Sequence, residues 1–536
     1  MTAIAPYQSP VRPGRDGFAQ LLRAEWTKFR TVRGWITGMI VAVLVSVLIG
    51  LFAAGGTSSS CQHVGGGPAR TGAACMPVFP VGPGGEPVSD SFYFVRQPLA
   101  GNGSITVRVT SLTGLLPPAN GQQTGPGPGD TRPGLESWAK AGIIIKDGTS
   151  QGSAYAAMMV TSDHGVRMQW DYTGDTAGQA GVVSAASPHW LRLTRDGDTL
   201  TGYDSTDGTH WTQTGTVHLA RLSSTVQAGL FATSPGYNPV TQSFGGGTNQ
   251  TGGGPTQATA VFDQLSRSGV WPGGTWTGDY IGAVDASGIG GYHQAGGRIT
   301  VTGSGDIAPI AAGHGGSADP AATVTDYLTG TFAGLIAIAV VATMFITAEY
   351  RRSLIRTTLM ASPRRGRVLA AKAIVIGSVA FVAGLAAAAA AVISGAAITH
   401  ARGYYMFPVP WPTELRVIIG TAALLAVTAV LTLAVGTAIR RSAATVVIVI
   451  VTIVLPYFLA VASVLPLGAS DWLLRITPAA AFALQQPVPQ YSQVTALYSP
   501  LSGYYPLAPW VGFAVLCGWA ALALCLAVVL LRRRDA

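Results

Sequence analysis

Six long runs of apolar residues alternate with polar segments along this chain. Each run holds about 20 uncharged residues or more, which is the length that an apolar helix needs to cross the hydrocarbon core of a membrane. The runs cover residues 35–54, 328–347, 373–398, 417–439, 443–465 and 510–531. The pattern predicts six transmembrane helices. A helix-patterned segment precedes the first run, so we expect an uncleaved anchor and not a signal peptide.

Between the first two runs the pattern changes to short β-type segments separated by turns. Eight such segments occupy residues 104–109, 141–145, 154–160, 166–172, 190–194, 199–203, 226–231 and 258–262. Typical hairpin turns occur at Asp147-Gly148, Asp196-Gly197 and Asp207-Gly208. This spacing predicts an antiparallel β-sandwich over 89–268. A glycine-rich return segment, 269–325, follows it and holds one strand-like piece at 298–302.

The predicted fold class is therefore an α-helical polytopic membrane protein with six transmembrane helices and an inserted all-β antiparallel sandwich. Residues 1–16 are predicted to be disordered and residues 55–88 to be a linker. Cys61 and Cys75 flank a glycine-rich stretch of this linker. If the linker lies outside the cytoplasm, where disulfides persist, we expect these two cysteines to form one bridge, with two free thiols as the alternative.

Charged residues make up only 11% of the chain, whereas soluble proteins have about 25%. The net charge is +9, and what it indicates about function depends on where the cations lie along the chain. Eighteen Lys and Arg residues fall before the first run, between the second and third, between the fourth and fifth, and after the sixth. The two short opposite loops carry only three. The positive-inside rule then places both termini in the cytoplasm and residues 55–325 outside it, in a multi-pass protein of the plasma membrane.

The charge distribution and the lysines exclude two functions. Residues 55–325 carry 12 basic and 17 acidic residues, so this region is not expected to bind nucleic acid. The chain has four lysines, and none completes the G-x-x-x-x-G-K-[ST] motif that cradles phosphates. The chain is therefore not expected to be its own ATPase.

The inserted region resembles concanavalin-like and laminin-G-like domains. The resemblance rests on the run WAKAGIIIK at 138–146 and on the hairpin at 190–204 with the tryptophan that follows it. Some sandwiches of this kind are glycosidases, which need paired carboxyl groups, but Glu86 and Glu136 are the only glutamates here. Binding of an envelope ligand is favoured over hydrolysis. The candidate stacking residues are Trp138, Trp170, Trp190 and Trp211, although for each of them a place in the sandwich core is favoured over a role in binding.

Two segments on the cytoplasmic side carry amphipathic patterns. Residues 17–33 place aromatic and apolar residues at helical spacing among arginines and are predicted to lie in the headgroup layer as an interfacial helix. Its apolar residues are Phe18, Leu22, Trp26 and Phe29. Between the second and third runs, the sequence EYRRSLIRTTLMASPRRGR at 349–367 predicts a short basic helix closed by Ser362-Pro363.

The predicted interfacial helix at 17–33, the six apolar runs and this basic loop together resemble the permease subunits of type 2 ABC exporters. The resemblance implies a homodimer or paired permease whose coupling helix, 351–360, docks on a separate ATP-binding subunit. The residues implied in that contact are Arg351, Arg352, Leu354, Ile355, Arg356 and Leu359. It also implies no cofactor in this chain, since ATP and magnesium would belong to the partner. The chain departs from the common pattern because its first outer loop is expanded into a whole domain.

Three functions remain open at this point. The first is an ABC exporter permease, embedded in membrane lipid. The second is a membrane-anchored recognition or sensor protein whose outer sandwich binds a cell-envelope glycan or peptide. An envelope enzyme is disfavoured because the sequence has no paired carboxylates, no Ser-His-Asp arrangement and no spacing typical of a metal site.

Overall fold

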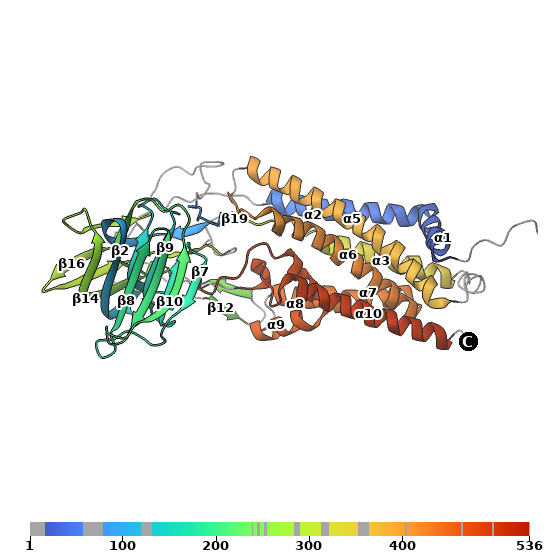
Figure 1. Cartoon of the computed structure of the whole chain (residues 1–536). Helices are drawn as coiled ribbons and strands as arrows, with labels where there is room; N and C mark the ends of the chain where they lie inside the picture. Colours follow the sequence, from blue (N-terminus) through green and yellow to red (C-terminus); the bar gives the residue numbers. More distant parts are fainter. Residues whose placement is uncertain are drawn as a thin grey trace, which may run out of the picture. The chain divides into compact units, whose positions relative to one another are not determined.

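The computed structural model describes residues 17–56, 79–118, 131–237, 240–243, 247–250, 254–282, 290–311, 321–351, 364–402, 405–462, 465–495 and 498–534. The chain divides into two compact units (Figure 1). The helical unit consists of Met1–Met76, Pro320–Pro487 and Ser499–Ala536. The β unit consists of Pro77–Asp319 and the short segment Val488–Tyr498. The chain thus contributes to the β unit at two places far apart in the sequence.

Six helices of the helical unit are long and apolar enough to cross a membrane, counted over the described residues. They are Arg33–Ala54, Asp326–Tyr350, Arg365–Ala401, Trp411–Ile439, Ser442–Val461 and Pro509–Arg533. The apolar helices of the predicted fold class are confirmed, and their passage through a membrane stays a prediction.

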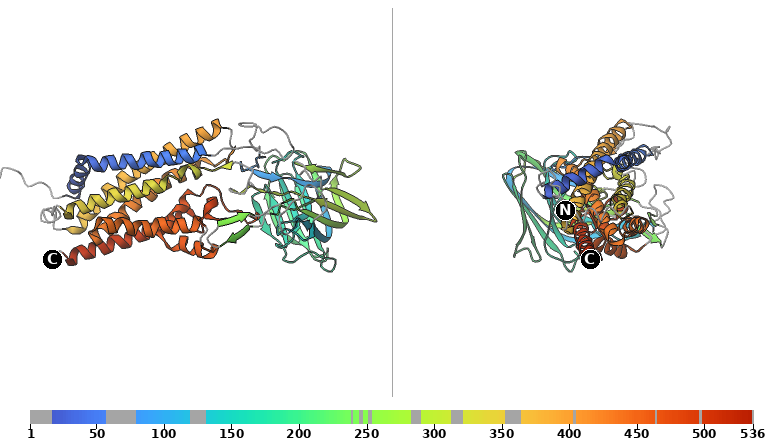
Figure 2. Two further views of the ribbon diagram at one scale, coloured as in Figure 1. Left: turned by 180° about the vertical axis from the view of Figure 1, so that it is seen from behind. Right: turned by 90° about the vertical axis from the view of Figure 1, so that its right-hand side faces the viewer.

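The helical unit contains the following elements, of which the long helices run along one another as a bundle (Figure 2). They are α1 (Phe18–Thr31), α2 (Arg33–Gly56), η2 (Asp326–Leu328), α3 (Thr331–Arg351), α5 (Arg365–Ala401), α6 (Trp411–Ile439), α7 (Ser442–Val449), η3 (Ile450–Val454), α8 (Leu455–Val461), α9 (Leu467–Ile476), η4 (Pro478–Gln485), η5 (Pro500–Ser502) and α10 (Pro509–Arg534). A parallel pair, β19 (Ala321–Ala322) and β20 (Tyr405–Met406), adds a short link.

The fifth apolar helix is interrupted at the position that its proline predicts. Pro456 has no N–H to donate, and the preceding turn, η3, is π-helical. The Leu455 N–H donates to the Ile450 carbonyl, five residues back. Elsewhere small residues permit close packing: a Cβ on Gly384 of α5 would lie 2.9 Å from Leu425 of α6. The alanine- and glycine-rich third run thus packs tightly against its neighbour.

The β unit is an antiparallel β-sandwich (Figure 1). Its strands are β1 (Val88–Asp90), β2 (Phe92–Leu116), β3 (Arg132–Pro133), β4 (Lys140–Lys146), β5 (Tyr155–Thr161), β6 (Val166–Trp170), β7 (Gly174–Ala177), β8 (His189–Asp196), β9 (Thr199–Ser205), β10 (Thr212–His218), β11 (Thr225–Thr233), β12 (Val240–Ser243), β13 (Gly247–Gln250), β14 (Gln257–Val270), β15 (Thr277–Ile281), β16 (Gly291–Ala295), β17 (Arg298–Gly303) and β18 (Ile307–Pro309).

The long strand β2 belongs to both sheets of the sandwich. Its first part, up to Ala100, pairs with β11 and β15, and β11 continues through β4, β5 and β6 to β7. Its second part, from Gly103 on, pairs with β8 and β14, which continue to β9, β10, β17 and β16. Gly101, with a φ of 63°, lies between the two parts. This positive φ suits a glycine, which has no Cβ.

The side chains between the two sheets form one apolar core. Alternate residues of each strand, such as Ile143 and Met158 in the first sheet and Leu191 and Phe262 in the second, are fully buried in it. The opposite face of the first sheet is also buried, under the pair of strands β1 and β18. Both faces of β4 are therefore covered, and all seven of its residues are buried.

Each of the eight segments predicted as β-type contributes to a strand of the sandwich. One expectation differs from the structure. The segment 269–325, expected to be a return segment outside the sandwich, holds β15, β16, β17 and β18, and β17 pairs with β14. The strand-like piece predicted at 298–302 corresponds to β17. The many glycines of the segment concealed β15, β16 and β18, because glycine is depleted from strands in general.

Candidate functional site

Three helices bring two carboxylates and two ammonium groups together in the helical unit. The Lys372 ammonium on α5 lies 2.7 Å from Glu25 Oε2 on α1 and 2.6 Å from Glu349 Oε1 on α3. The Lys28 ammonium on α1 lies 2.9 Å from Glu25 Oε1 and 3.1 Å from Glu349 Oε1. Each lysine therefore bridges both carboxylates. We call these four residues the ion network.

Most of the ion network is removed from solvent. The side chains of Lys372 and Glu25 are 1% and 2% exposed, that of Glu349 is 8% exposed, and that of Lys28 is 40% exposed. A buried charge is tolerated only when it is paired, and here two positive and two negative groups balance. Burial lowers the pKa of Lys28, but its hydrogen bond to Glu25 and the charge of Glu349 outweigh that effect and raise the pKa overall.

Aromatic side chains pack beside the ion network. The Lys372 ammonium lies 5.0 Å from the centre of the Phe345 ring, a cation–π distance. Phe345 in turn contacts Phe29 and Trp35 edge to face. Helix α1 is thus attached to α3 and α5 by both charge and aromatic packing.

The ion network brackets the loop in which the coupling helix is expected. Glu349 lies two residues before the end of α3, and Lys372 lies within the second turn of α5. Arg351 is the last residue of α3. The other residues of the expected contact, Arg352, Leu354, Ile355, Arg356 and Leu359, lie outside the described residues, as do Cys61 and Cys75. Both assignments stay predictions.

The four apolar residues predicted on the interfacial helix do not share one environment. Phe18 and Trp26 are exposed, Leu22 is half-buried, and Phe29 is only 4% exposed. Phe29 points to the same side as Glu25, since residues four apart share a helix face. One side of α1 therefore faces the helix bundle and another side remains open.

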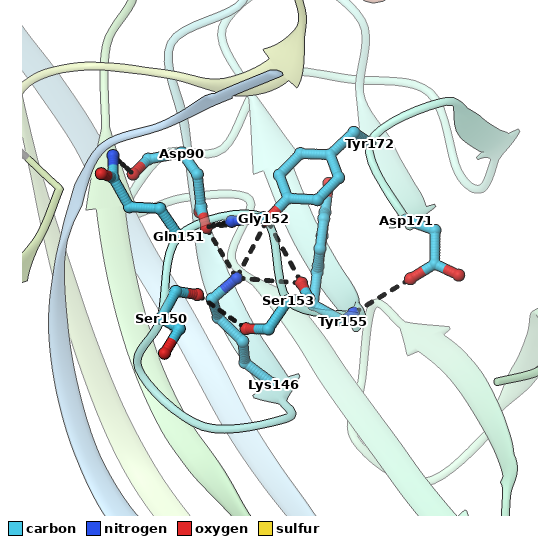
Figure 3. Close-up of polar contacts among 9 residues, drawn as sticks. All are labelled: Asp90, Lys146, Ser150, Gln151, Gly152, Ser153, Tyr155, Asp171 and Tyr172. Atoms are coloured by element: carbon cyan, nitrogen blue, oxygen red, sulfur yellow. Dashed lines mark hydrogen bonds and ion pairs between the residues drawn. The ribbon is translucent and has the colours of Figure 1, made fainter. Parts of the chain in front are cut away.

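A second buried polar cluster lies in the β unit (Figure 3). The Lys146 ammonium lies 2.7 Å from Asp90 Oδ2 and donates to the Ser153 carbonyl and to Tyr172 Oη. The Tyr172 hydroxyl and the Gly152 N–H also donate to Asp90 Oδ2. Burial lowers the pKa of Lys146, although the negative charge of Asp90 acts to raise it. The pKa of Tyr172 is raised, first by burial and then by the charge of Asp90.

The backbone beside this cluster has an uncommon conformation. Asp171 and Tyr172, which follow β6, have φ values of 42° and 63°. Side chains with a Cβ rarely adopt such angles. Asp171 Oδ1 accepts a hydrogen bond from the Tyr155 N–H, and the Tyr172 carbonyl accepts one from Gln493 Nε2 at 2.9 Å. The segment Val488–Tyr498 thus supports the turn that carries Tyr172.

The two lysines of β4 hold β1 and β18 over the first sheet. Lys140 and Lys146, six residues apart, point to the same face because side chains alternate along a strand. Lys140 lies 2.9 Å from Asp306 Oδ1 and donates to the Ile307 carbonyl. Lys146 and Asp90 are fully buried. Their geometry anchors β1 to the sheet.

The four tryptophans proposed for ligand stacking lie on different parts of the sandwich. Trp138 is 4% exposed and stacks on His164, with ring centres 3.8 Å apart. Trp170 packs at the margin of the core. Trp190 and Trp211 are half-buried, with the guanidinium carbons of Arg108 and Arg192 at 5.7 Å and 3.8 Å from their ring centres, respectively. Their role in binding a ligand stays a prediction.

Neither Glu25 nor the pairing of Glu349 with Lys372 is predicted by the sequence pattern. Lys372 falls among the loop cations in that pattern because the third apolar run begins after it. A signal was present in the lysines themselves. All four, Lys28, Lys140, Lys146 and Lys372, form ion pairs with carboxylates. In a chain with 33 cations of which only four are lysines, each lysine marked an ion pair within the protein.

Comparisons with known proteins bear on the β unit alone. Residues 131–248 match a family model described as a protein of unknown function, DUF1349. The match covers β3 to β12 and the first half of β13. The sequence has no match among curated proteins.

Several solved structures are similar to part of the chain. A functionally unknown protein from Saccharomyces cerevisiae has 15% identity and a TM-score of 0.22, over 37% of this chain and 85% of its own. Scytalido-glutamic peptidase with a transition state analog inhibitor has 8% identity and a TM-score of 0.25, over 41% and 100%. A lectin from Bauhinia forficata in complex with GalNAc has 13% identity and a TM-score of 0.17, over 40% and 97%. At these scores none of the three indicates what this chain does.

Proposed function

We propose that this chain is the transmembrane permease subunit of an ABC exporter, energised by a separate ATP-binding subunit. The observation that carries the proposal is the ion network, whose members Glu349 and Lys372 flank the basic loop that resembles the coupling helix of these permeases. A force on that loop would act first on the two helix ends that the network joins to α1. In this proposal the chain is not an enzyme, holds no cofactor, and acts as a homodimer or paired permease.

The proposal places the six apolar helices in the plasma membrane, with both termini in the cytoplasm and residues 55–325 outside. The distribution of Lys and Arg supports this orientation. Single cysteines at Asp207, in the β9–β10 hairpin, and at Arg367, at the start of α5, test it in a chain whose native cysteines are replaced by serine. An impermeant maleimide added to whole cells should label the first and not the second. The reverse labelling would overturn the orientation.

The docking site is tested by co-purification of the detergent-solubilised chain with its candidate ATP-binding subunit. The variant Leu354→Asp with Ile355→Asp should lose the complex, because both residues belong to the expected contact. The matched control adds two charges on the same side of the membrane, at the exposed end of α1, as Thr31→Asp with Val32→Asp. A complex kept by the control and lost by the test variant supports the proposal. No complex with the unchanged chain would overturn it.

The alternative function is a membrane-anchored recognition or sensor protein that binds an envelope glycan or peptide. One observation favours it: Val488–Tyr498, a segment between η4 and α10, belongs to the β unit and holds Tyr172 through Gln493. A ligand that altered the sandwich would thereby act on the chain between two helices. The concanavalin-like character of the sandwich is part of this alternative. Binding of peptidoglycan fragments or wall glycans to the whole chain, without any effect of nucleotide on binding, would favour it.

A further inference from the structure

An apolar groove opens between α1, α2 and α5. It has a volume of about 380 Å³ and is lined by Trp26 of α1, Met39 and Val43 of α2, and Val379, Val382 and Ala386 of α5. Its size falls in the range of ligand pockets, and its lining is apolar except for Ser378. Trp26 and Val382 are 46% and 65% exposed. The groove is thus open to its surroundings and suited to an apolar acyl chain.

A row of arginines runs past the groove on the same helix as Trp26. Arg23, Trp26 and Arg30 follow one another at spacings of three and four residues, which puts them on one stripe of α1. Arg33 begins α2. All three arginines are exposed, and within the described part of the chain none has a carboxylate at ion-pairing distance. The charges of α1 that are paired, Glu25 and Lys28, lie in the ion network instead.

We propose that this groove binds one anionic phospholipid, with an acyl chain between α2 and α5 and the phosphate on Arg23 and Arg30. A guanidinium fork matches the geometry of a phosphate and binds it through two hydrogen bonds. The indole of Trp26, with an apolar ring and a polar N–H, suits the boundary between the headgroup and the acyl chain. This inference rests on the proposed membrane location, and it adds a lipid class and a site to it.

Charge also decides against a second copy of the chain as the occupant. A symmetric contact through this face would bring the same surface of both copies together. The arginines of one α1 would then meet those of the other, and juxtaposed like charges oppose association. An anionic headgroup is complementary to the same row.

The test is native mass spectrometry of the delipidated full chain with phosphatidylglycerol or phosphatidylcholine of identical acyl chains. The unchanged protein should retain one phosphatidylglycerol per chain, at least tenfold more tightly than phosphatidylcholine. Arg23→Gln with Arg30→Gln should weaken phosphatidylglycerol about tenfold and leave phosphatidylcholine unchanged, since each arginine near an anionic surface contributes on the order of a few-fold in affinity. Ala386→Trp, which fills the groove, should weaken both lipids.

Matched controls separate this site from general adhesion of lipid. Arg532→Gln with Arg533→Gln removes two exposed arginines of α10, and Ala521→Trp adds the same bulk to an exposed position of α10. Both should bind phosphatidylglycerol like the unchanged protein. Equal binding of the two lipids, an ineffective Ala386→Trp, or a dimer that Ala386→Trp abolishes would overturn the inference. Because lipid retention is read without the ATP-binding subunit, its failure is distinct from failure of the docking experiment.

Discussion

Lys372 and Glu349 lie on two helices joined by the segment 352–364, and their side chains form an ion pair of 2.6 Å inside the helical unit. Glu25, from a helix more than 300 residues away in sequence, binds the same ammonium at 2.7 Å. Through Lys372, the only lysine of the third apolar helix, α1 is joined to the end of α3 and the start of α5. Of the two cations that contact both carboxylates, Lys372 is the buried one.

The first prediction concerns the loss of that cation. Lys372→Met should destabilise the helical unit by roughly 3–5 kcal/mol, because it leaves Glu25 and Glu349 buried with only Lys28 to balance them. Thermal unfolding of the detergent-solubilised chain measures the loss. Arg367→Met removes an exposed cation of the same helix and should change stability by less than about 0.5 kcal/mol. Equal effects of the two substitutions would contradict the buried network.

The second prediction concerns the buried pair of the β unit. Lys146→Met should cost roughly 3–5 kcal/mol, because Asp90 would be left charged and fully buried. The double change Lys146→Met with Asp90→Leu should recover part of that loss, since an apolar pair of similar volume can replace a buried ion pair. Denaturant unfolding followed by tryptophan fluorescence gives both values. If the double variant loses as much stability as the single variants Lys146→Met and Asp90→Leu lose together, the two residues do not interact.

The repeating features of the fold were predictable from the sequence. The apolar helices follow from uninterrupted runs of about 20 residues. Strand β8 follows from alternation that places one apolar face in the core, whereas β4 and β5 follow from short apolar runs bounded by turn residues. The turns after Asp147 and Asp196 were readable because glycine at the next position accepts a positive φ, 87° at Gly148 and 60° at Gly197.

The polar clusters could not be predicted in the same way. Glu25 and Lys372 are separated by 347 positions and Lys146 and Asp90 by 56, so their pairing depends on the complete fold and not on any local pattern. Gln493 is a further case, since it lies between two helices in the sequence and yet supports a turn of the sandwich. Periodicity identifies which side chains are buried, whereas the partner of a buried charge is set by tertiary contacts.

The third prediction concerns the turn after β6. Asp171→Asn should change stability by less than about 1 kcal/mol, because asparagine tolerates a positive φ and keeps an oxygen for the Tyr155 N–H. Asp171→Val should cost about 2–4 kcal/mol, the sum of backbone strain and a lost hydrogen bond. Thermal unfolding of the two variants in parallel measures the difference. A tolerated valine would mean that the turn does not hold this conformation.

The last prediction uses the ionisation of Tyr491. Burial, followed by the charge of Glu86 and by Tyr498, raises the pKa of Tyr491 to about 12. The folded protein then retains a proton that the unfolded chain loses near pH 10, so this tyrosine contributes stability that is complete below pH 10 and is lost as the pH rises toward 12. Because Tyr491 is partly exposed, the loss should stay below about 1 kcal/mol.

Two measurements check this sign. The difference in phenolate absorbance between the unchanged protein and Tyr491→Phe, read just after a rapid pH jump and before unfolding, should titrate near pH 12. The stability lost between pH 9.5 and 11.5 should be smaller in Tyr491→Phe, since the residue responsible is gone and no other group has changed, by up to about 1 kcal/mol. A difference titration centred near pH 10 would mean that Tyr491 is open to solvent. The segment Val488–Tyr498 would then not pack on the β unit, and the support that Gln493 gives to Tyr172 would fail with it.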